Sequence, residues 1–142
     1  PIYQDRLEGF REVTAREFPD IELIGPFEAH DDRGETETFA AGLLRDHPDL
    51  RGIYNLGAGN AGLITALERS GRASKVRVIA HELYDHTHAG LKSGAIDVVL
   101  DQNPDGEIRA AVASARALAM GQVQDPHAEP IEIGIFLRDN LR

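Results

Sequence analysis

Polar residues that could bind a ligand gather in three short stretches, each directly after an apolar run. The first stretch holds Asn55 and Asn60, the second begins with His81 and Glu82, and the third contains Gln102. An amide side chain offers a donor and an acceptor together, and a carboxylate accepts from two hydroxyl groups at once. Amides and a carboxylate that meet in one place are typical of a site that binds a small polyhydroxylated molecule.

The glycine-rich turn in the first stretch also matches a second kind of site. Gly57, Gly59 and Gly62 have the G-x-G-x-x-G spacing, and Glu82 follows about 20 residues later, as in dinucleotide-binding units. Such glycines let the backbone approach a pyrophosphate, while the acidic residue binds ribose hydroxyls. The plainer interpretation is a tight strand-to-helix turn, which the polar Asn55 favours. An NAD(P)-binding oxidoreductase domain remains an alternative.

The stretch 81–88 is rich in side chains that bind metals, because it contains His81, Glu82, Asp85, His86 and His88. Its spacing does not match the H-E-x-x-H pattern of zinc proteases. Ligands from one loop of changing direction also converge poorly on a single ion. We therefore interpret these histidines as solvated loop residues and predict no metal site.

Apolar runs alternate with helical patterns along the whole chain, beginning on a helix. The predicted helices cover 5–18, 35–46, 61–70, 87–93 and 105–120, and the predicted strands cover 21–24, 52–56, 76–80, 97–100 and 131–136. This alternation predicts an α/β fold with a parallel sheet flanked by helices. In such sheets ligands bind beyond the carboxyl ends of the strands, where the three polar stretches lie. We expect the polar connection at 121–130 to be a surface loop.

Composition narrows the possible functions. The chain has 142 residues, of which 42% are hydrophobic and 27% charged, as expected for one globular domain. Its formal net charge of −9 repels the phosphate backbone, so we do not expect this chain alone to bind DNA. The lack of cysteine excludes disulfides and thiolate chemistry. We find no membrane-spanning run and no signal sequence, and expect a cytoplasmic protein.

Nearly the whole chain resembles the second half of the sugar-binding domain shared by lactose-repressor (LacI/GalR) regulators and periplasmic ribose-type binding proteins. The opening Asp5-Arg6-Leu7-Glu8-Gly9-Phe10 resembles the family's R-x-x-G-F helix start, in which the arginine contacts the ligand. The segment 94–104 resembles the family's glycine followed by Q-x-P, whose glutamine lines the cleft. The resemblance thus implies ligand-binding roles for Arg6 and Gln102.

Two further segments carry the resemblance with departures from the family pattern. The segment 52–56 resembles a strand that ends in a ligand-binding asparagine, but a Gly-Ala-Gly-Asn turn follows, so both Asn55 and Asn60 are candidates. The segment 78–82 resembles a strand ending in G-x-D, with Glu82 in place of the aspartate. The resemblance implies sugar binding without catalytic residues, metal or cofactor.

The closing segment, which ends Phe136-Leu-Arg-Asp-Asn-Leu141, resembles the repressors more than the secreted binding proteins. The resemblance therefore implies that residues 1–142 are the C-terminal lobe of the effector-binding domain of a LacI-type regulator. A sugar or polyol effector would change the affinity of a homodimer for operator DNA. The DNA would be contacted only through an N-terminal helix-turn-helix that this chain lacks. A periplasmic sugar-binding protein of a transporter is the alternative.

Overall fold

The computed structural model describes residues 2–122 and 130–141. The helices and strands of this part follow one another in the order α1 (Ile2–Glu17), α2 (Arg33–Asp46), β1 (Gly52–Tyr54), α3 (Asn60–Arg69), β2 (Arg77–His81), α4 (Asp85–Ser93), β3 (Val98–Asp101), α5 (Pro104–Ala119), β4 (Gly134–Phe136) and a 3-10 helix (Arg138–Asn140). None of the helices in this part has the length and hydropathy needed to span a membrane. Most of the connection at 121–130 lies outside the described residues.

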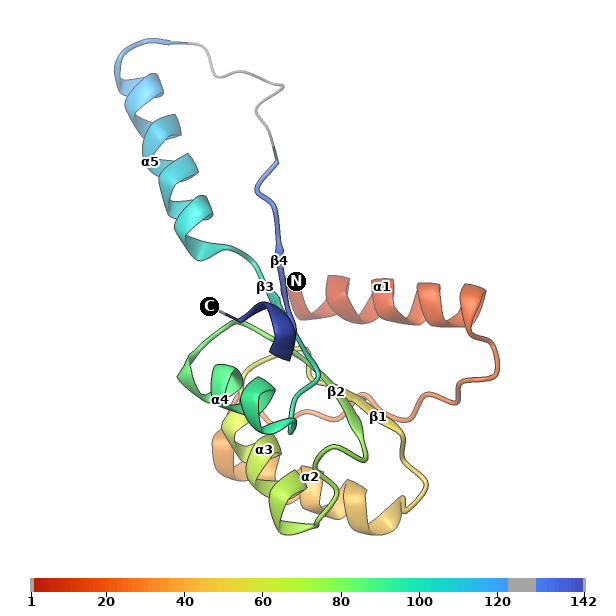
Figure 1. The fold of residues 1–142 in the computed structure, drawn as a ribbon. Coiled ribbons are helices and arrows are strands. Elements are labelled where there is room, and N and C mark those ends of the chain that lie inside the picture. The colour runs from red at the N-terminus through yellow and green to blue at the C-terminus, as the bar shows by residue number, and fades with distance from the viewer. Residues whose placement is uncertain (1, 123–129, 142) are drawn as a thin grey trace.

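The strands form one sheet in the order β1-β2-β3-β4 (Figure 1). β1, β2 and β3 are parallel, with Tyr54 opposite Ile79 and His81 opposite Leu100. Parallel pairing places the carboxyl ends of these strands at one edge of the sheet, as the sequence predicts. The predicted α/β fold with a helix-flanked parallel sheet is therefore confirmed for these three strands.

The last strand runs in the opposite direction, which the sequence analysis did not anticipate. β4 pairs with β3 in antiparallel register, with Leu100 opposite Ile135. A parallel strand would need a crossover helix packed on the sheet. α5 instead projects away from the body and has no buried residue, and the chain returns toward the sheet beside it (Figure 1). β4 therefore starts beside the carboxyl end of β3, with Gly134 opposite Asp101.

The strand predicted at 21–24 is wrong. These residues are exposed and carry no strand assignment, and the backbone N–H of Ile21 donates to Phe18 in a turn that closes α1. Their apolar pattern is typical of a strand, but a strand also needs a neighbour for its backbone groups. Within the described residues this segment has no such neighbour.

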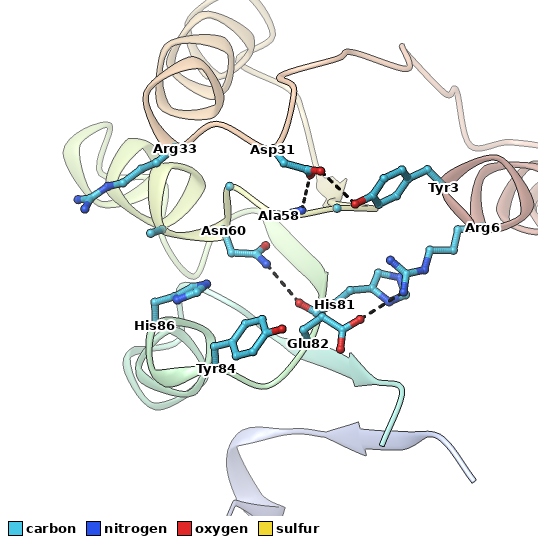
Figure 2. Close-up of a pocket in the computed structure, with 13 residues that line it drawn as sticks. Tyr3, Arg6, Asp31, Arg33, Ala58, Asn60, His81, Glu82, Tyr84 and His86 are labelled. Atoms are coloured by element: carbon cyan, nitrogen blue, oxygen red, sulfur yellow. Dashed lines mark hydrogen bonds and ion pairs between the residues drawn. The ribbon is translucent and has the colours of Figure 1, made fainter. Parts of the chain in front are cut away.

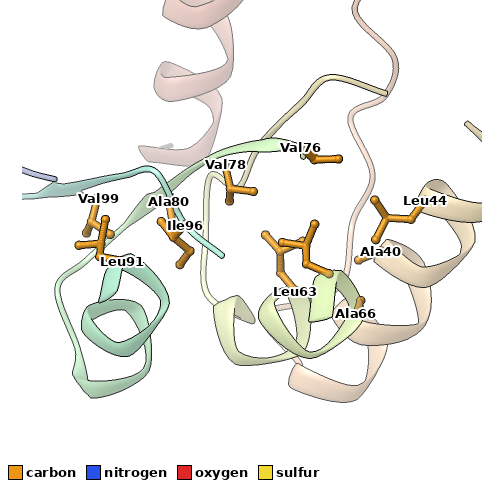
Figure 3. Packing of buried hydrophobic residues seen from close by; sticks show 11 residues of the cluster. Ala40, Leu44, Leu63, Ala66, Val76, Val78, Ala80, Leu91, Ile96 and Val99 are labelled. Atoms are coloured by element: carbon orange, nitrogen blue, oxygen red, sulfur yellow. The ribbon is translucent and has the colours of Figure 1, made fainter. Parts of the chain in front are cut away.

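One hydrophobic core lies between the sheet and the helices α2, α3 and α4 (Figure 3). The side chain of Val78 on β2 faces Leu63 of α3, and Val99 on β3 lies beside Leu91 of α4 (Figure 3). All of these residues are almost fully buried. Replacing a leucine in such a core with alanine costs about 2–5 kcal/mol. The core therefore fixes the strands whose ends form the site.

Local capping agrees with the sequence. Asp32 is the N-cap of α2, because its side chain accepts the backbone N–H of Glu35 at 2.8 Å. Asn103 caps α5 through a 3.1 Å bond from the N–H of Gly106, and Pro104 follows in the first turn. The Asp32 cap fixes the start of α2, and the Asn103 cap fixes the start of α5.

Candidate functional site

An open pocket of about 370 Å³ lies beyond the carboxyl ends of β1 and β2 (Figure 2). Four parts of the chain contribute to it: the start of α1, the connection before α2, the glycine-rich turn and the connection between β2 and α4. Its lining residues are Tyr3, Arg6, Asp31, Arg33, Gly57, Ala58, Gly59, Asn60, Ala61, His81, Glu82, Tyr84 and His86. Of the five predicted ligand-binding residues, it brings together Arg6, Asn60 and Glu82.

Arg6 and Glu82 form an ion pair in this pocket. The Arg6 Nη2 lies 3.3 Å from Glu82 Oε1, and Nη1 donates to the carbonyl oxygen of Leu56 at 2.6 Å. The side chains are 12% and 29% exposed, respectively. Both groups thus keep hydrogen-bonding capacity toward the pocket while each holds the other in place. Together they offer donors and acceptors to neighbouring polar groups of a ligand.

His81 lines the pocket and is bonded to Tyr54, which does not line it. The Tyr54 hydroxyl lies 2.9 Å from His81 Nε2, and Phe10 of α1 packs against the Tyr54 ring with a centroid distance of 4.9 Å. Burial, followed by the positive charge of Arg6, lowers the pKa of His81 to about 4. The imidazole is therefore neutral at pH 7.

The two candidate asparagines are bonded to each other. Asn55 Nδ2 donates to Asn60 Oδ1 at 2.7 Å and to the carbonyl of Ala58 at 3.0 Å. Asn60 is 2% exposed, and its Nδ2 donates to the carbonyl of His81 at 3.2 Å. Asn60 lines the pocket. Asn55 does not line it but bonds to Ala58 and Asn60 of the turn. Both amides thus link the glycine-rich turn to the end of β2.

Packing against α2 and a contact with the Asp31 carboxylate explain why this turn is rich in glycine. Gly59 has a φ of 82°, and a side chain on Gly62 would collide with the backbone carbonyl of Arg33 at the start of α2. Asp31 Oδ1 accepts the backbone N–H of Ala58 at 2.8 Å, so the chain's own carboxylate bonds to the turn. A pyrophosphate would have to compete with this carboxylate. The G-x-G-x-x-G spacing is thus fully accounted for by the turn.

Tyr3 and Asp31 are pocket residues that the sequence analysis missed. The Tyr3 hydroxyl donates to Asp31 Oδ2 at 3.0 Å, and this bond raises the pKa of Tyr3 (Figure 2). Tyr3 precedes Arg6 by three residues on α1, so helical periodicity places both on one face and could have identified it. Asp31 follows no strand and had no such signal.

Gln102 follows β3, as predicted, but it does not line this pocket. Its neighbour Asn103 caps α5 and donates from Nδ2 to the carbonyl of Glu132 at 3.2 Å. This contact ties the two chain segments that lead to and from α5. The structure thus places Gln102 where these segments meet, while Arg6, Asn60 and Glu82 gather at β1 and β2.

The histidine-rich stretch does not form a cluster of metal ligands. Within residues 2–122 and 130–141, no group of three His, Cys, Asp or Glu side chains could hold a metal ion. His81 is buried under the pocket, whereas His86 is exposed on α4. The change of direction between β2 and α4 separates these side chains.

Several solved structures share this fold. A solute-binding protein of an ABC transporter from Burkholderia graminis, in complex with D-arabinose, is 26% identical with a TM-score of 0.87, covering 96% of this chain and 48% of that chain. A sugar-binding protein of an ABC transporter from Bacillus halodurans is 25% identical with a TM-score of 0.83, covering 96% and 51%. A glucose-galactose binding protein from Geobacillus stearothermophilus is 23% identical with a TM-score of 0.83, covering 97% and 49%.

This chain therefore spans about half the length of these similar structures. No sequence among the curated proteins matches it. The family model described as "Periplasmic binding protein domain" matches residues 1–122. Because the match covers most of the chain, this chain belongs to the periplasmic binding protein domain family.

Proposed function

We propose that this chain is the C-terminal lobe of a two-lobed protein that binds a monosaccharide or similar polyol. The observation that carries the proposal is the Arg6–Glu82 ion pair, which lies in an open pocket at the carboxyl ends of parallel strands. A guanidinium supplies several donors and a carboxylate supplies acceptors, which suits neighbouring hydroxyl groups. We propose binding alone for these residues and assign no catalytic step to them.

The structural neighbours support a sugar as the ligand. D-arabinose is bound in the Burkholderia graminis protein, and related proteins from Agrobacterium vitis hold D-tagatose and D-fucose. These proteins are solute-binding components of ABC transporters. We therefore propose first that this chain belongs to a protein that carries a sugar to a transporter. The pocket of this chain has the mixed polar and aromatic lining that a sugar requires.

A sugar-responsive regulator of the lactose-repressor type is the second candidate. The closing segment 136–141, which resembles the repressors, favours it. The transporter proteins match 96–97% of this chain, however, and this likeness is the reason that the regulator stands second. In this second proposal, a cytoplasmic homodimer would contact operator DNA through residues outside this chain.

A thermal-shift screen of the full-length protein tests sugar binding. D-arabinose, D-fucose, D-tagatose, D-galactose, D-glucose and nicotinamide dinucleotides are the compounds. A native-state ligand at about 100 times its dissociation constant stabilises by about 2.7 kcal/mol. We expect stabilisation by at least one sugar and a loss of that stabilisation in Glu82→Ala. Glu68→Ala, which removes an exposed carboxylate on α3, is the matched control.

Two outcomes would contradict the proposal. Stabilisation by a dinucleotide alone would restore the oxidoreductase alternative, and equal sugar binding in Glu82→Ala would place the ligand elsewhere. A further measurement distinguishes the carrier from the regulator. Sugar-dependent binding of the full-length protein to operator DNA supports the regulator, and sugar-dependent docking to a transporter permease supports the carrier.

A further inference from the structure

His81 has an unusual environment for a residue at the end of a buried strand. It is 6% exposed, lies directly before Glu82 and lines the pocket. Its Nε2 is bonded to the Tyr54 hydroxyl at 2.9 Å, which fixes the orientation of the ring. The ring is therefore held on one side, and His81 lines the same pocket as Arg6 and Glu82.

The second ring nitrogen has no partner. His81 Nδ1 is the one buried side-chain nitrogen or oxygen without a hydrogen bond in the part of the chain that the structure describes. Leaving a buried polar group unpaired costs about 1–3 kcal/mol, so native proteins rarely do so without a reason. A ligand group that reaches Nδ1 would recover this energy.

The charged groups around the ring come from two other segments. Arg6 of α1 lies close enough for its charge to act on His81, and Glu82 follows His81 in the connection to α4. Tyr54 of β1 is a further titratable neighbour of the ring. A ligand held by Arg6 and Glu82 would thus occupy the pocket that His81 also lines.

We infer that His81 is a further ligand-binding residue, whose Nδ1 pairs with a hydroxyl group of the sugar bound by Arg6 and Glu82. This inference rests on the proposed function. A hydroxyl group suits Nδ1 because it both donates and accepts, and so pairs with either tautomer of the neutral ring. Tyr54 acts through His81 as a positioning residue.

The neutral state of the ring agrees with this role. Because the pKa of His81 is lowered to about 4, the ring carries no charge at pH 7 and does not repel Arg6. A protonated ring would place two positive charges side by side in the pocket. A neutral ring can pair with an uncharged hydroxyl group of a ligand.

Two substitutions of His81 test the roles of its two ring nitrogens separately. In His81→Gln the side-chain amide reaches the position of Nε2, whereas in His81→Asn it reaches the position of Nδ1. His88→Gln, on α4 and outside the pocket lining, is the matched control. D-arabinose, D-fucose and D-tagatose are titrated calorimetrically into the full-length protein and each variant, and thermal unfolding without sugar checks the fold.

For the sugar that binds, we expect His81→Gln to weaken affinity about five- to tenfold, which is the net value of one hydrogen bond. His81→Asn should stay within about threefold of wild type in affinity, although it loses the bond to Tyr54 and unfolds at a lower temperature. Unchanged affinity in His81→Gln, or an equal loss in both variants, overturns the inference. The proposed function survives either result.

A second measurement covers the case in which the variants do not fold. Nitrogen-15 NMR of the histidine rings in the wild-type protein should show a change at His81 Nδ1 when the bound sugar is added. An unchanged Nδ1 signal with a bound sugar overturns the inference alone. If none of the three sugars binds the wild-type protein, the inference fails together with the proposed sugar.

Discussion

Contacts between distant residues hold the pocket together. Arg6 and Glu82 are 76 positions apart in the sequence, and Tyr54 and His81 are 27 apart. Residue type and position after a strand were enough to nominate Glu82, whereas Arg6 was nominated because the opening helix resembles the family's R-x-x-G-F start. The partner of each residue was not visible, because a one-dimensional pattern does not show which side chains meet across elements.

Arg6→Lys should distinguish the effect of the positive charge on sugar binding from the effect of the guanidinium geometry. A lysine keeps the positive charge but cannot bond to the Leu56 carbonyl and Glu82 at the same time, as the arginine fork does. We expect the sugar affinity to fall about tenfold or more and the free energy of unfolding to fall by about 1 kcal/mol. Calorimetric titration measures the first and chemical denaturation the second. Arg11→Lys, at an exposed position of α1, should match wild type.

Protonation of His81 should make the folded state sensitive to acid. Its folded pKa of about 4 lies below the ordinary value of 6.5, so the unfolded chain takes up the proton first as pH falls. Stability from this residue is complete above pH 6.5 and is lost as pH falls toward 4, by roughly 2–3 kcal/mol. Urea denaturation at pH 7, 5.5 and 4.5 measures the decline. A decline of the same size in His81→Gln would contradict this assignment.

Close packing of α2 against α3 explains the glycines of the turn before α3. Gly62 lies where α3 meets the first turn of α2, and Gly59 adopts the left-handed conformation just before α3. The sequence motif is compatible with both a dinucleotide site and a tight turn. The close approach of α2 and the Asp31 contact favour the turn, and neither was predictable from the glycine spacing.

Gly62→Ala should therefore destabilise the lobe. The added methyl group meets the Arg33 carbonyl, which is backbone and cannot rotate away, so α2 and α3 must separate. Overpacking of this kind costs about 2 kcal/mol or more. Gly9→Ala is the matched control, because a methyl group there meets nothing and should stabilise α1 by roughly 0.5–1 kcal/mol. Equal unfolding free energies for the two variants would show that α2 and α3 are not closely packed.

The whole molecule divides into a packed lobe and projecting parts. α2, α3 and α4 bury their apolar faces on the sheet, whereas α5 leaves Ile108 and Val112 exposed. An amphipathic helix of this length gains little stability without a partner. Because the similar structures are about twice as long as this chain, we expect their other half to indicate what covers α5.

Hydrogen exchange should reveal this division. In the chain of residues 1–142, we expect amides of α5 to exchange much faster than those of α3, because α3 has five buried residues and α5 has none. In the two-lobed protein that we propose, the amides of α5 should become protected. Equal protection of the two helices in the chain alone would show that α5 packs on the lobe by itself.

The sequence alone determined the α/β class, most helices and parallel strands, and the polar residues at strand ends. These features depend on local periodicity and on caps such as Asp32, which neighbouring residues specify. The tertiary structure decided that 21–24 forms no strand, that β4 is antiparallel and that Gln102 does not line the pocket that holds Arg6 and Glu82. Strand pairing and side-chain convergence depend on contacts between distant segments, and local sequence patterns do not contain that information.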